Sequence, residues 1–436
     1  MGTNPTLSQI PIVIKPSKES LSLARKRWLV RATAITALIL IPVTGLFRID
    51  VSAGFVVLDR QIWFSDFFIV FGFWLTAACA LIMLYSTMGT VFCGWICPQN
   101  TVSTWANDLT SRLLGKRAIL SWGDETKSVK VSAGKDHWYN WAILAIKLTG
   151  ISMLFALIPM LYFFPSGAIW SFITFQDDIR LAASLYWIYT VFVLITLVNV
   201  AVVRHYVCRY MCIYRMWQFL FKTRDTLHIN YDETRSDACL TCNFCVTACP
   251  VEIDPRNTLT YDSCTNCGEC ISACNDLHHK KGLTGLLSYK FGARRGKALT
   301  NNTRALASLL QRGSWVLPVM VLAIGMFTWG IVSYQPQGLS VYRSDIMHGD
   351  HVQNYRINVA NKLYAGTAVY VDVEGLPDGS YQLSDNKVVF DTVGRGDLNL
   401  HIENQLPPGL HVITVHAHSD SGWQDSYRVH HLVEKG

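Results

Sequence analysis

Charged residues are scarce in this chain. Only 16% of its 436 residues are Asp, Glu, Lys or Arg, whereas 50% are apolar. Together with a mean hydropathy of +0.24, this balance argues against a soluble enzyme and for membrane-spanning helices. We also find neither a hydrolytic triad nor a phosphate-binding loop, which argues against hydrolases and P-loop enzymes.

Cysteine is missing from the C-terminal part of the chain. The sequence has 13 cysteines and none lies after Cys274, so a domain beyond that point contains no disulfide. The cysteines that are present form patterns typical of metal ligands kept in a reducing compartment. The net charge of +7 does not indicate nucleic-acid binding, because the basic residues flank apolar stretches, as in membrane proteins.

Uninterrupted apolar segments predict five membrane spans, each near the ~20 residues that a helix needs to cross a bilayer. They cover residues of about 29–47, 67–91, 141–163, 183–203 and 314–333. A cleaved signal peptide is the alternative for the first segment, with Val51-Ser52-Ala53 as the cleavage site. The long polar leader, which ends in Arg25, Lys26 and Arg27, favours an uncleaved anchor.

The distribution of basic residues predicts the orientation. Loops 98–140 and 204–313 are rich in Lys and Arg, whereas loops 48–66 and 164–182 hold only Arg48, Arg60 and Arg180. By the positive-inside rule, the N-terminus and both basic loops are cytoplasmic. Five spans then place residues 334–436 outside the inner membrane, in the periplasm of a Gram-negative cell.

The exported tail has the pattern of an all-β domain. Apolar and polar residues alternate over Tyr355–Val359, Ala368–Val373, Lys387–Phe390, Leu398–Ile402 and His411–Val415, and turn signals such as Leu376-Pro377-Asp378-Gly379 separate these stretches. About 100 residues with turns at this frequency predict an immunoglobulin-like β-sandwich.

Two nearly identical cysteine runs dominate the middle of the chain. The first is Cys239-x2-Cys242-x2-Cys245-x3-Cys249-Pro250 and the second is Cys264-x2-Cys267-x2-Cys270-x3-Cys274. Three cysteines at this spacing can hold part of a cubane iron–sulfur cluster, and in two-cluster ferredoxins the fourth ligand comes from the other run. The pattern therefore predicts two [4Fe-4S] clusters: Cys239, Cys242, Cys245 and Cys274 bind cluster 1, and Cys264, Cys267, Cys270 and Cys249 bind cluster 2. Zinc sites and disulfide frameworks do not usually repeat this spacing.

Two further pairs, Cys93-x3-Cys97-Pro98 and Cys208-x3-Cys212, lie where predicted spans leave the membrane on the cytoplasmic side. Cysteines four apart on a helix share a face, so four thiolates can converge at the membrane surface. We consider Cu(I), another cluster or a pair of redox dithiols as their function. The alternative is that they are buried structural cysteines, which is our reading of Cys79 in mid-span. For His205 we expect a side chain facing lipid headgroups rather than a metal ligand.

These residues resemble a known family. Phe92-Cys93-Gly94-Trp95-Ile96-Cys97-Pro98-Gln99 followed by Trp105 resembles the first motif of the CcoG (FixG, RdxA) family of cytochrome oxidase accessory proteins. Arg204-His205-Tyr206-Val207-Cys208-Arg209-Tyr210-Met211-Cys212 resembles its second motif, and Asp225-Thr226-Leu227 with Tyr231-Asp232 resembles the segment that follows. The sequence departs from the family at Ile213, where proline is usual, so the backbone after Cys212 is freer to continue as a helix.

The resemblance implies a membrane-anchored iron–sulfur electron-transfer protein that serves assembly of cbb3-type cytochrome c oxidase. It implies reduction of Cu(II) to Cu(I), with Cys93, Cys97, Cys208 and Cys212 as candidate copper or redox thiolates. The expected partners are a cytoplasmic electron donor, copper ions, oxidase assembly factors or subunits, and membrane lipid, but no nucleic acid. Association into homo-oligomers is left open, as is enzymatic cupric reductase activity. A respiratory ferredoxin subunit exchanging electrons with quinol is the alternative, and a structural assembly scaffold is the second.

The sequence thus predicts an α-helical integral membrane protein with five spans, a cytoplasmic dicluster 2[4Fe-4S] ferredoxin-type module and a C-terminal immunoglobulin-like β-sandwich. Its predicted parts are a cytoplasmic tail (1–28), a four-span membrane domain (29–203), a connector with the second cysteine pair (204–238), the dicluster module (239–280), a basic linker (281–313), the fifth span (314–333) and the periplasmic sandwich (334–436).

Overall fold

The structure is a computed structural model in which two compact units are distinguished. The first comprises Met1–Leu40, Trp74–Leu161 and Gly167–Ala323, and the second comprises Ile41–Phe73, Tyr162–Ser166 and Ile324–Gly436. The residues that the structure describes are 16–50, 54–58, 60–119, 129–178, 180–182, 184–222, 225–239, 242–258, 262–279, 282–291, 302–344, 354–377, 379–403 and 406–433. The start of the predicted tail, the suggested cleavage site 51–53 and residues 292–301 of the predicted linker lie outside them.

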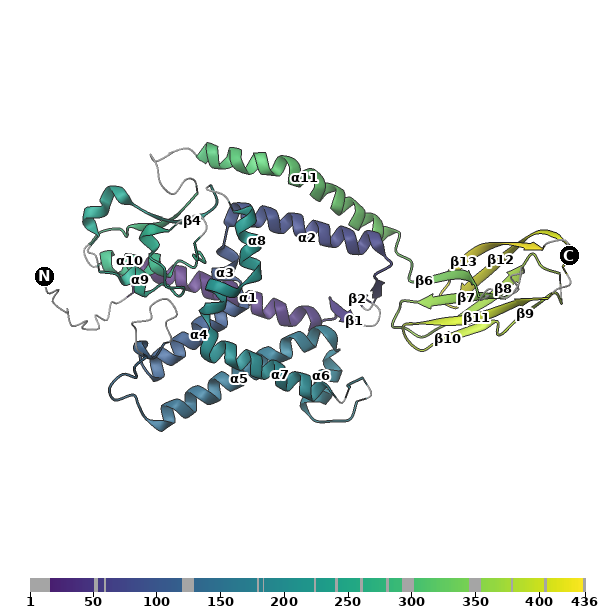
Figure 1. Cartoon of the computed structure of the whole chain (residues 1–436), viewed down its shortest axis with the longest axis horizontal. Coiled ribbons are helices and arrows are strands. Elements are labelled where there is room, and N and C mark those ends of the chain that lie inside the picture. Colours follow the sequence, from purple (N-terminus) through teal and green to yellow (C-terminus); the bar gives the residue numbers. More distant parts are fainter. Residues whose placement is uncertain are drawn as a thin grey trace. The chain divides into compact units, whose positions relative to one another are not determined.

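Four of the described helices are long and apolar enough to cross a membrane (Figure 1). They cover Phe67–Met88, Trp138–Phe163, Leu185–Val203 and Gly313–Val332, which confirms long apolar helices at the predicted second to fifth spans. The corresponding elements are α2 (Phe67–Met88), α5 (Trp138–Phe163), α7 (Leu185–Val198) with the π-helical η2 (Asn199–Val203), and α11 (Asn302–Val332). Apolar side chains on all sides suit a helix surrounded by lipid.

The predicted first span differs from the other four. Helix α1 (Lys18–Val43) covers most of this segment, but Arg25, Lys26, Arg27 and Arg31 all lie within it. The apolar part that follows Arg31 is shorter than the ~20 residues of a full crossing. A fifth span therefore stays a prediction, and the charged half of α1 has contacts of its own, described below.

Short elements connect the long helices of the first unit. They are α3 (Val91–Trp95), α4 (Pro98–Leu113), η1 (Lys116–Ala118), α6 (Ser166–Ile173), the π-helical η3 (Val207–Met211) and α8 (Ile213–Phe221). Helix α8 begins directly after Cys212, whose ψ of 113° is not helical, so Ile213 does not let the preceding helical turn continue through Cys212. The first cysteine of each pair lies in a short helical element, α3 or η3, and the second directly precedes the next helix.

The two cysteine runs form a small module that a pair of strands closes. Strand β4 (His228–Tyr231) precedes the runs and pairs antiparallel with β5 (Leu287–Lys290), which follows them. Between the strands lie η4 (Glu233–Ala238), α9 (Phe244–Thr247), η5 (Pro255–Asn257) and α10 (Glu269–His279). The core of the module consists of Ile229, Ile271 and Leu287 together with Cys264 and Cys270. Cysteines thus occupy positions that aliphatic side chains fill in an ordinary core.

The second unit is built from antiparallel sheets. Strands β1 (Arg48–Asp50), β2 (Gly54–Val57) and β3 (Arg60–Trp63) form one small sheet. The C-terminal strands are β6 (Gln337–Arg343), β7 (Asn354–Asn361), β8 (Thr367–Glu374), β9 (Tyr381–Leu383), β10 (Lys387–Phe390), β11 (Gly394–Ile402), β12 (Gly409–Ser419) and β13 (Gln424–Val433). They form two sheets, with orders β6-β7-β11-β9 and β10-β8-β12-β13 (Figure 1).

These two sheets share one hydrophobic core, so the C-terminal part is a β-sandwich. Ile357 and Leu400 from one sheet and Val369, Ile413 and Val415 from the other are at most 1% exposed. The orders β6-β7-β11 and β8-β12-β13 correspond to the A-B-E and C-F-G sets of immunoglobulin-like sandwiches. All five predicted strand segments fall within β7, β8, β10, β11 and β12.

The loop that holds β1–β3 contacts the sandwich within this unit. Lys362 Nζ lies 2.7 Å from Asp66 Oδ1 and 5.1 Å from the centre of the Trp63 ring. The backbone N–H of Gln61 donates to the carbonyl of Lys362 at 2.9 Å, and the Tyr334 hydroxyl donates to the carbonyl of Gln61 at 2.8 Å. Because segments that touch in this way must lie on one side of a membrane, these contacts agree with the predicted placement of both on the exported side.

Two glycines of the turn after β8 provide a stability test. Gly375 and Gly379 both have positive φ, of 95° and 84°, but a Cβ would contact the backbone of Val412 at Gly375 and would meet nothing within 4 Å at Gly379. We expect Gly375→Ala to destabilise the sandwich by about 1–3 kcal/mol more than Gly379→Ala, because only the first adds overpacking to backbone strain. Amide hydrogen exchange in β8 and β12 measures this difference, and equal exchange in both variants would contradict it.

Candidate metal centres

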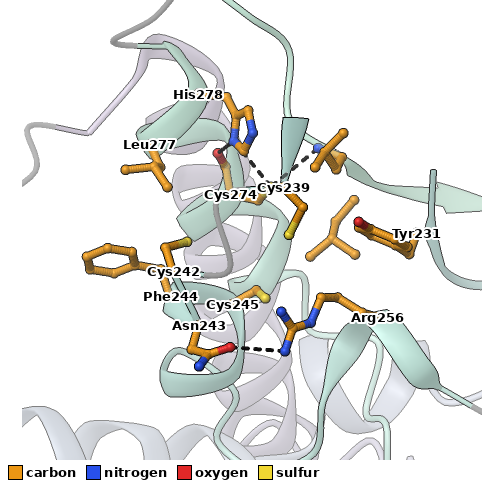
Figure 2. Close-up of a pocket in the computed structure, with 12 residues that line it drawn as sticks. Tyr231, Cys239, Cys242, Asn243, Phe244, Cys245, Arg256, Cys274, Leu277 and His278 are labelled. Atoms are coloured by element: carbon orange, nitrogen blue, oxygen red, sulfur yellow. Dashed lines mark hydrogen bonds between the residues drawn. The ribbon is translucent and has the colours of Figure 1, made fainter. Parts of the chain in front are cut away.

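Four cysteines surround one pocket of the small module (Figure 2). Cys239, Cys242 and Cys245 come from the first run, and Cys274 reaches the pocket from α10, in the second run. The pocket contains about 370 Å³ of space, including its open side. Cys242 is exposed, unlike every other cysteine in the chain, so this group lies close to the module surface. The arrangement brings together the residues predicted for cluster 1.

A backbone donor and a histidine ring lie at the sulfur of Cys274. The backbone N–H of Leu286 donates to its Sγ at 3.3 Å, and Nδ1 of the buried His278 lies 3.0 Å from the carbonyl oxygen of Cys274 and 3.6 Å from its sulfur. The other ring nitrogen of His278 lies 3.2 Å from the carbonyl of Ala238, which fixes the orientation of the ring. Such bonds favour thiolate over thiol and influence the reduction potential of a cluster.

The other four cysteines of the runs lie deeper. Cys264, Cys267 and Cys270 are 6%, 7% and 3% exposed. Burial raises the pKa of the Cys264 thiol to about 12, and burial also raises the pKa of Cys270, with the neighbouring Cys267, Cys264 and Cys249 adding to the effect. Because Cys245 of the first run also raises the pKa of Cys270, these shifts place the thiols of both runs near one another, and the assignment of Cys249, Cys264, Cys267 and Cys270 to cluster 2 stays a prediction. A metal centre that replaces the thiol protons compensates the negative charge of the buried thiolates, which burial alone disfavours.

The two C-x3-C pairs have matching local structures. Cys97 and Cys212 are the N-cap residues of α4 and α8, with ψ near 122° and 113°. Their partners Cys93 and Cys208 lie one turn earlier, in α3 and in the π-helical η3. The N-terminus of a helix favours a negative charge, and π-helical turns are frequent at functional sites. The second cysteine of each pair therefore starts a helix, although burial raises the pKa of the Cys97 thiol above its ordinary value.

The four thiols of these pairs lie in one electrostatic neighbourhood, which we call the membrane-edge group. Burial raises the pKa of Cys208 to about 12, and the other three thiols, Cys97, Cys93 and Cys212, raise it further. Burial also raises the pKa of Cys93 to about 11. The structure therefore brings together the two pairs, which are more than 100 residues apart in the sequence.

A buried polar network holds the two pairs side by side. In α4, the amide of Asn100 donates to the carbonyl of Cys93 at 2.8 Å, and its Oδ1 lies 2.9 Å from Nε2 of His205. Gln99 exchanges hydrogen bonds of 2.8 and 2.9 Å with Asn199. These hydrogen bonds connect the first cysteine pair to Asn199 and His205, which precede the second pair in the sequence.

His205 lies inside this network, which corrects the expectation that it faces lipid headgroups. It is 6% exposed, and its Nδ1 lies 3.2 Å from the amide nitrogen of Asn107. Burial, with the neighbouring charges of Arg204 and Arg31, lowers its pKa to about 4. A neutral ring that donates from Nε2 to Asn100 and accepts from Asn107 at Nδ1 satisfies both contacts. Both hydrogen bonds require a ring with two nitrogen atoms. The sequence alone does not reveal that Asn100 and Asn107 are the partners of this ring.

The first pair packs directly against the second cysteine run. A Cβ on Gly94 would lie 2.6 Å from the carbonyl oxygen of Thr265 and 2.7 Å from Cα of Cys267, so only glycine fits there. The Thr90 hydroxyl donates to the carbonyl of Cys264 at 2.8 Å, and the Trp95 indole donates to the carbonyl of Asn266 at 3.1 Å. The membrane-edge group therefore adjoins the cluster 2 cysteines.

Helix α8 connects the second pair to both groups. Arg215, 7% exposed, donates to the carbonyls of Cys208 and Asp262, the latter at 2.8 Å. The fully buried Gln218 lies one turn further on, and its Nε2 is 3.1 Å from Sγ of Cys93. Sequence analysis did not single out these two residues. The available signal was their spacing of three, which places both on one helix face just after Cys212.

The charged half of α1 contacts the same region. Arg27 donates to the carbonyl of Cys267 at 2.7 Å and pairs with Glu269 at 2.5 Å. Arg31 donates to the carbonyl of Gly94 at 2.8 Å, and the backbone N–H of Ser17 donates to Asp276 at 2.7 Å. Basic residues that the sequence suggests as topology signals thus also bind the cysteine module.

Two arginines of this region are buried. Arg204 is 6% exposed, and within the described residues it forms no ion pair with Asp or Glu, whereas Arg215 is 7% exposed and has the charges of Cys93, Asp262, Cys208 and Cys264 near it. A buried charge is costly unless an opposite charge lies near it. Metal centres ligated by several thiolates carry net negative charge, so the donor set and its surroundings fit iron–sulfur clusters. Within the same residues, no three His, Cys, Asp or Glu side chains are close enough to enclose a single metal ion.

Two protein-family models match the chain. Residues 234–292 match a 4Fe-4S dicluster domain, which includes all eight cysteines of the runs. Residues 70–117 match a 4Fe-4S binding domain, which includes Cys93 and Cys97. The matches establish 4Fe-4S binding regions with cysteine clusters in this chain.

Similar proteins are known from several bacteria. Protein RdxA of Cereibacter sphaeroides is 27% identical over 211 residues, which cover 45% of this chain and 42% of RdxA. The nitrogen fixation protein FixG of Rhizobium meliloti is 27% identical over 224 residues, which cover 45% of this chain and 39% of FixG. The chain thus spans about two fifths of the length of the curated relatives it matches.

Solved structures give weaker similarities. A FixG-related protein from Vibrio parahaemolyticus is 17% identical and covers 24% of this chain and 100% of its own, with a TM-score of 0.20. The periplasmic chaperone SfaE is 11% identical and covers 23% of this chain and 58% of its own, with a TM-score of 0.19. At these TM-scores the structural matches carry no argument. On its sequence and its 4Fe-4S regions, the chain is a homologue of the RdxA and FixG proteins.

Proposed function

We propose that this membrane iron–sulfur protein transfers electrons to a metal ion at the membrane-edge group, and that it reduces Cu(II) to Cu(I) for assembly of a cbb3-type cytochrome c oxidase. The observation that carries the proposal is the packing of Gly94 between Cys93 and Cys97 against Thr265 and Cys267 of the second run. A thiolate site in direct contact with an iron–sulfur module suits one-electron chemistry. Thiolates favour Cu(I) over Cu(II), so they retain the reduced product.

The chain's residues have defined tasks in this proposal. Cluster 1 would be held by Cys239, Cys242, Cys245 and Cys274, and cluster 2 by Cys249, Cys264, Cys267 and Cys270. When bound, the clusters supply one-electron transfer from a cytoplasmic donor. Copper is the substrate: each Cu(II) gains one electron at the membrane-edge thiolates and leaves as Cu(I), and the donor is oxidised in turn.

Buried cations support an electron-rich centre at this place. Arg215 lies within the electrostatic neighbourhood of Cys93, Cys208 and Cys264, which belong to both groups of thiols. Its fixed positive charge stabilises thiolates and favours the arrival of an electron. Because a single ion is not enclosed by three ligands in the described residues, copper binding requires the thiols to rotate toward the ion.

The contacts within each unit support the proposed topology. Segments 16–31, 90–100 and 262–276 contact one another, and all three are predicted to lie in the cytoplasm or where a span meets it. We propose an inner-membrane protein with five spans, a cytoplasmic N-terminus and module, and an exported immunoglobulin-like sandwich. Its proposed partners are a cytoplasmic electron donor and factors or subunits of the oxidase.

A second candidate for the membrane-edge group is a further iron–sulfur cluster. The match of residues 70–117 to a 4Fe-4S binding domain favours it, because this region contains Cys93 and Cys97. In that case the four thiols of the two pairs bind iron rather than copper. The two candidates differ in the iron content that the thiols retain.

Serine substitutions at all four membrane-edge cysteines test the proposal. We expect the anaerobically reduced full-length protein to convert added Cu(II) to Cu(I), detected with a chromophoric chelator. The variant with Cys93, Cys97, Cys208 and Cys212 changed to serine should lose this reaction yet keep about eight iron atoms per chain. Cys79→Ala, at a buried cysteine in α2, is the matched control and should behave like the wild type.

Two outcomes of this experiment contradict the copper assignment. Equal Cu(I) formation by the serine variant would place the reaction elsewhere. A loss of about four iron atoms in the variant would show that the group binds a further cluster.

A substitution at Gly94 tests the contact between the two groups. Gly94→Ala adds a methyl group that meets the backbone at 2.6–2.8 Å, so we expect about 1–3 kcal/mol of overpacking. The first pair should move away from the second run, and Cu(I) formation should slow while the iron content stays unchanged. Gly150→Ala, where a Cβ meets nothing within 4 Å, is the control. Wild-type rates in Gly94→Ala would show that the contact is not needed.

A further inference from the structure

Helix α8 buries its polar residues and exposes its apolar residues, which is the reverse of a helix on a water-exposed surface. Its polar residues Arg215 and Gln218 are buried at 7% and 0% exposure. Its apolar residues are exposed: Ile213 70%, Tyr214 69%, Met216 69%, Trp217 54% and Leu220 71%. Soluble surfaces rarely present such a continuous apolar face, which marks a site of contact with another molecule or with lipid.

Both ends of α8 lie at the ends of membrane-spanning helices. It begins at Cys212, nine residues after the span that ends at Val203. At its other end, the carbonyl of Phe221 accepts a hydrogen bond of 3.2 Å from the hydroxyl of Ser86, in the last turn of α2. In Figure 1, α8 runs across the direction of α2 rather than along it. The helix therefore leads from the segment after α7 to the last turn of α2.

The spans near α8 also end in exposed apolar side chains. Ile195 and Val198 in the last turns of α7 are 59% and 48% exposed, and Met88 at the end of α2 is 46% exposed. Long apolar helices such as α2 and α7 are stable when lipid surrounds them. Trp and Tyr, both found on the face of α8, are the aromatic residues enriched at membrane–water interfaces.

We propose that α8 lies in the plane of the cytoplasmic membrane interface, with Ile213, Met216, Trp217 and Leu220 in contact with lipid. Interfacial helices bury an apolar face about 5–10 Å deep at the boundary between headgroups and acyl chains. The opposite face of α8 then presents Arg215 and Gln218 to Cys208 and Cys93. Lipid contact thereby positions the residues that hold the membrane-edge thiols, whichever metal these thiols bind.

Site-specific photocrosslinking tests the lipid contact directly. The full-length protein, with p-benzoylphenylalanine in place of Met216, is reconstituted into phosphatidylcholine–phosphatidylglycerol vesicles and irradiated. We expect lipid adducts at position 216 by peptide mass spectrometry. Leu283, 50% exposed in the cysteine module, is the control position and should give none. A crosslink between two copies of the chain, or no lipid adduct at position 216, would overturn the proposal.

A second experiment tests the link between the lipid contact and the thiols. Met216→Glu with Leu220→Glu places carboxylates in the apolar interface and should release α8 from it. We expect Cys93 and Cys208 of the anaerobically purified protein in vesicles to be alkylated about tenfold faster than in the wild type. Leu283→Glu should leave the rates unchanged. Unchanged alkylation in the double variant would refute the role of lipid in positioning the thiols, independently of any copper measurement.

Discussion

The structure depends on the burial of many thiols beside cations in a small volume at one end of the membrane helices. Protonated thiols would pack as small apolar groups, but then Arg204 would remain a buried charge without an ion pair to a carboxylate of the described residues, and Arg215 would lose the thiolate charges near it. Metal centres ligated by thiolates remove both problems, because they take the place of the thiol protons and carry negative charge. The fold around the cysteines is therefore complete only with its metals.

This constraint explains why distant segments meet in the first unit. The charged half of α1 binds the second cysteine run through Arg27, the turn after α2 packs against it through Gly94, and α8 reaches it through Arg215. Arg27 and Arg215 bind backbone carbonyls in or near the second run, and Gln218 and Leu286 donate to cysteine sulfur atoms. The protein thus orients its ligands through the hydrogen bonds that surround them.

The sequence was sufficient to predict the long apolar helices and the strands of the sandwich, because each has a strong local pattern, whereas the division of the eight cysteines between two clusters stays a prediction. It was not sufficient for contacts that depend on tertiary packing. His205 was expected at the headgroups and is buried against Asn100 and Asn107, since a single histidine has no periodicity to reveal its partners. Arg27 and Arg31 read as topology signals, yet they also bind the module. Arg215 and Gln218 are recognisable only once α8 is seen with its apolar face outward.

The most direct test of the account is Mössbauer spectroscopy of the full-length protein. The protein is produced in cells supplied with ⁵⁷Fe and purified without oxygen. The account predicts [4Fe-4S] signals with about eight iron atoms per chain bound by the two cysteine runs. Serine at Cys249 should remove the signal of one cluster and leave the other, because this residue is the last cysteine of the first run but lies among the thiols that raise the pKa of Cys270 in the second. Zinc in place of iron, or loss of both signals together in a folded variant, would contradict the account.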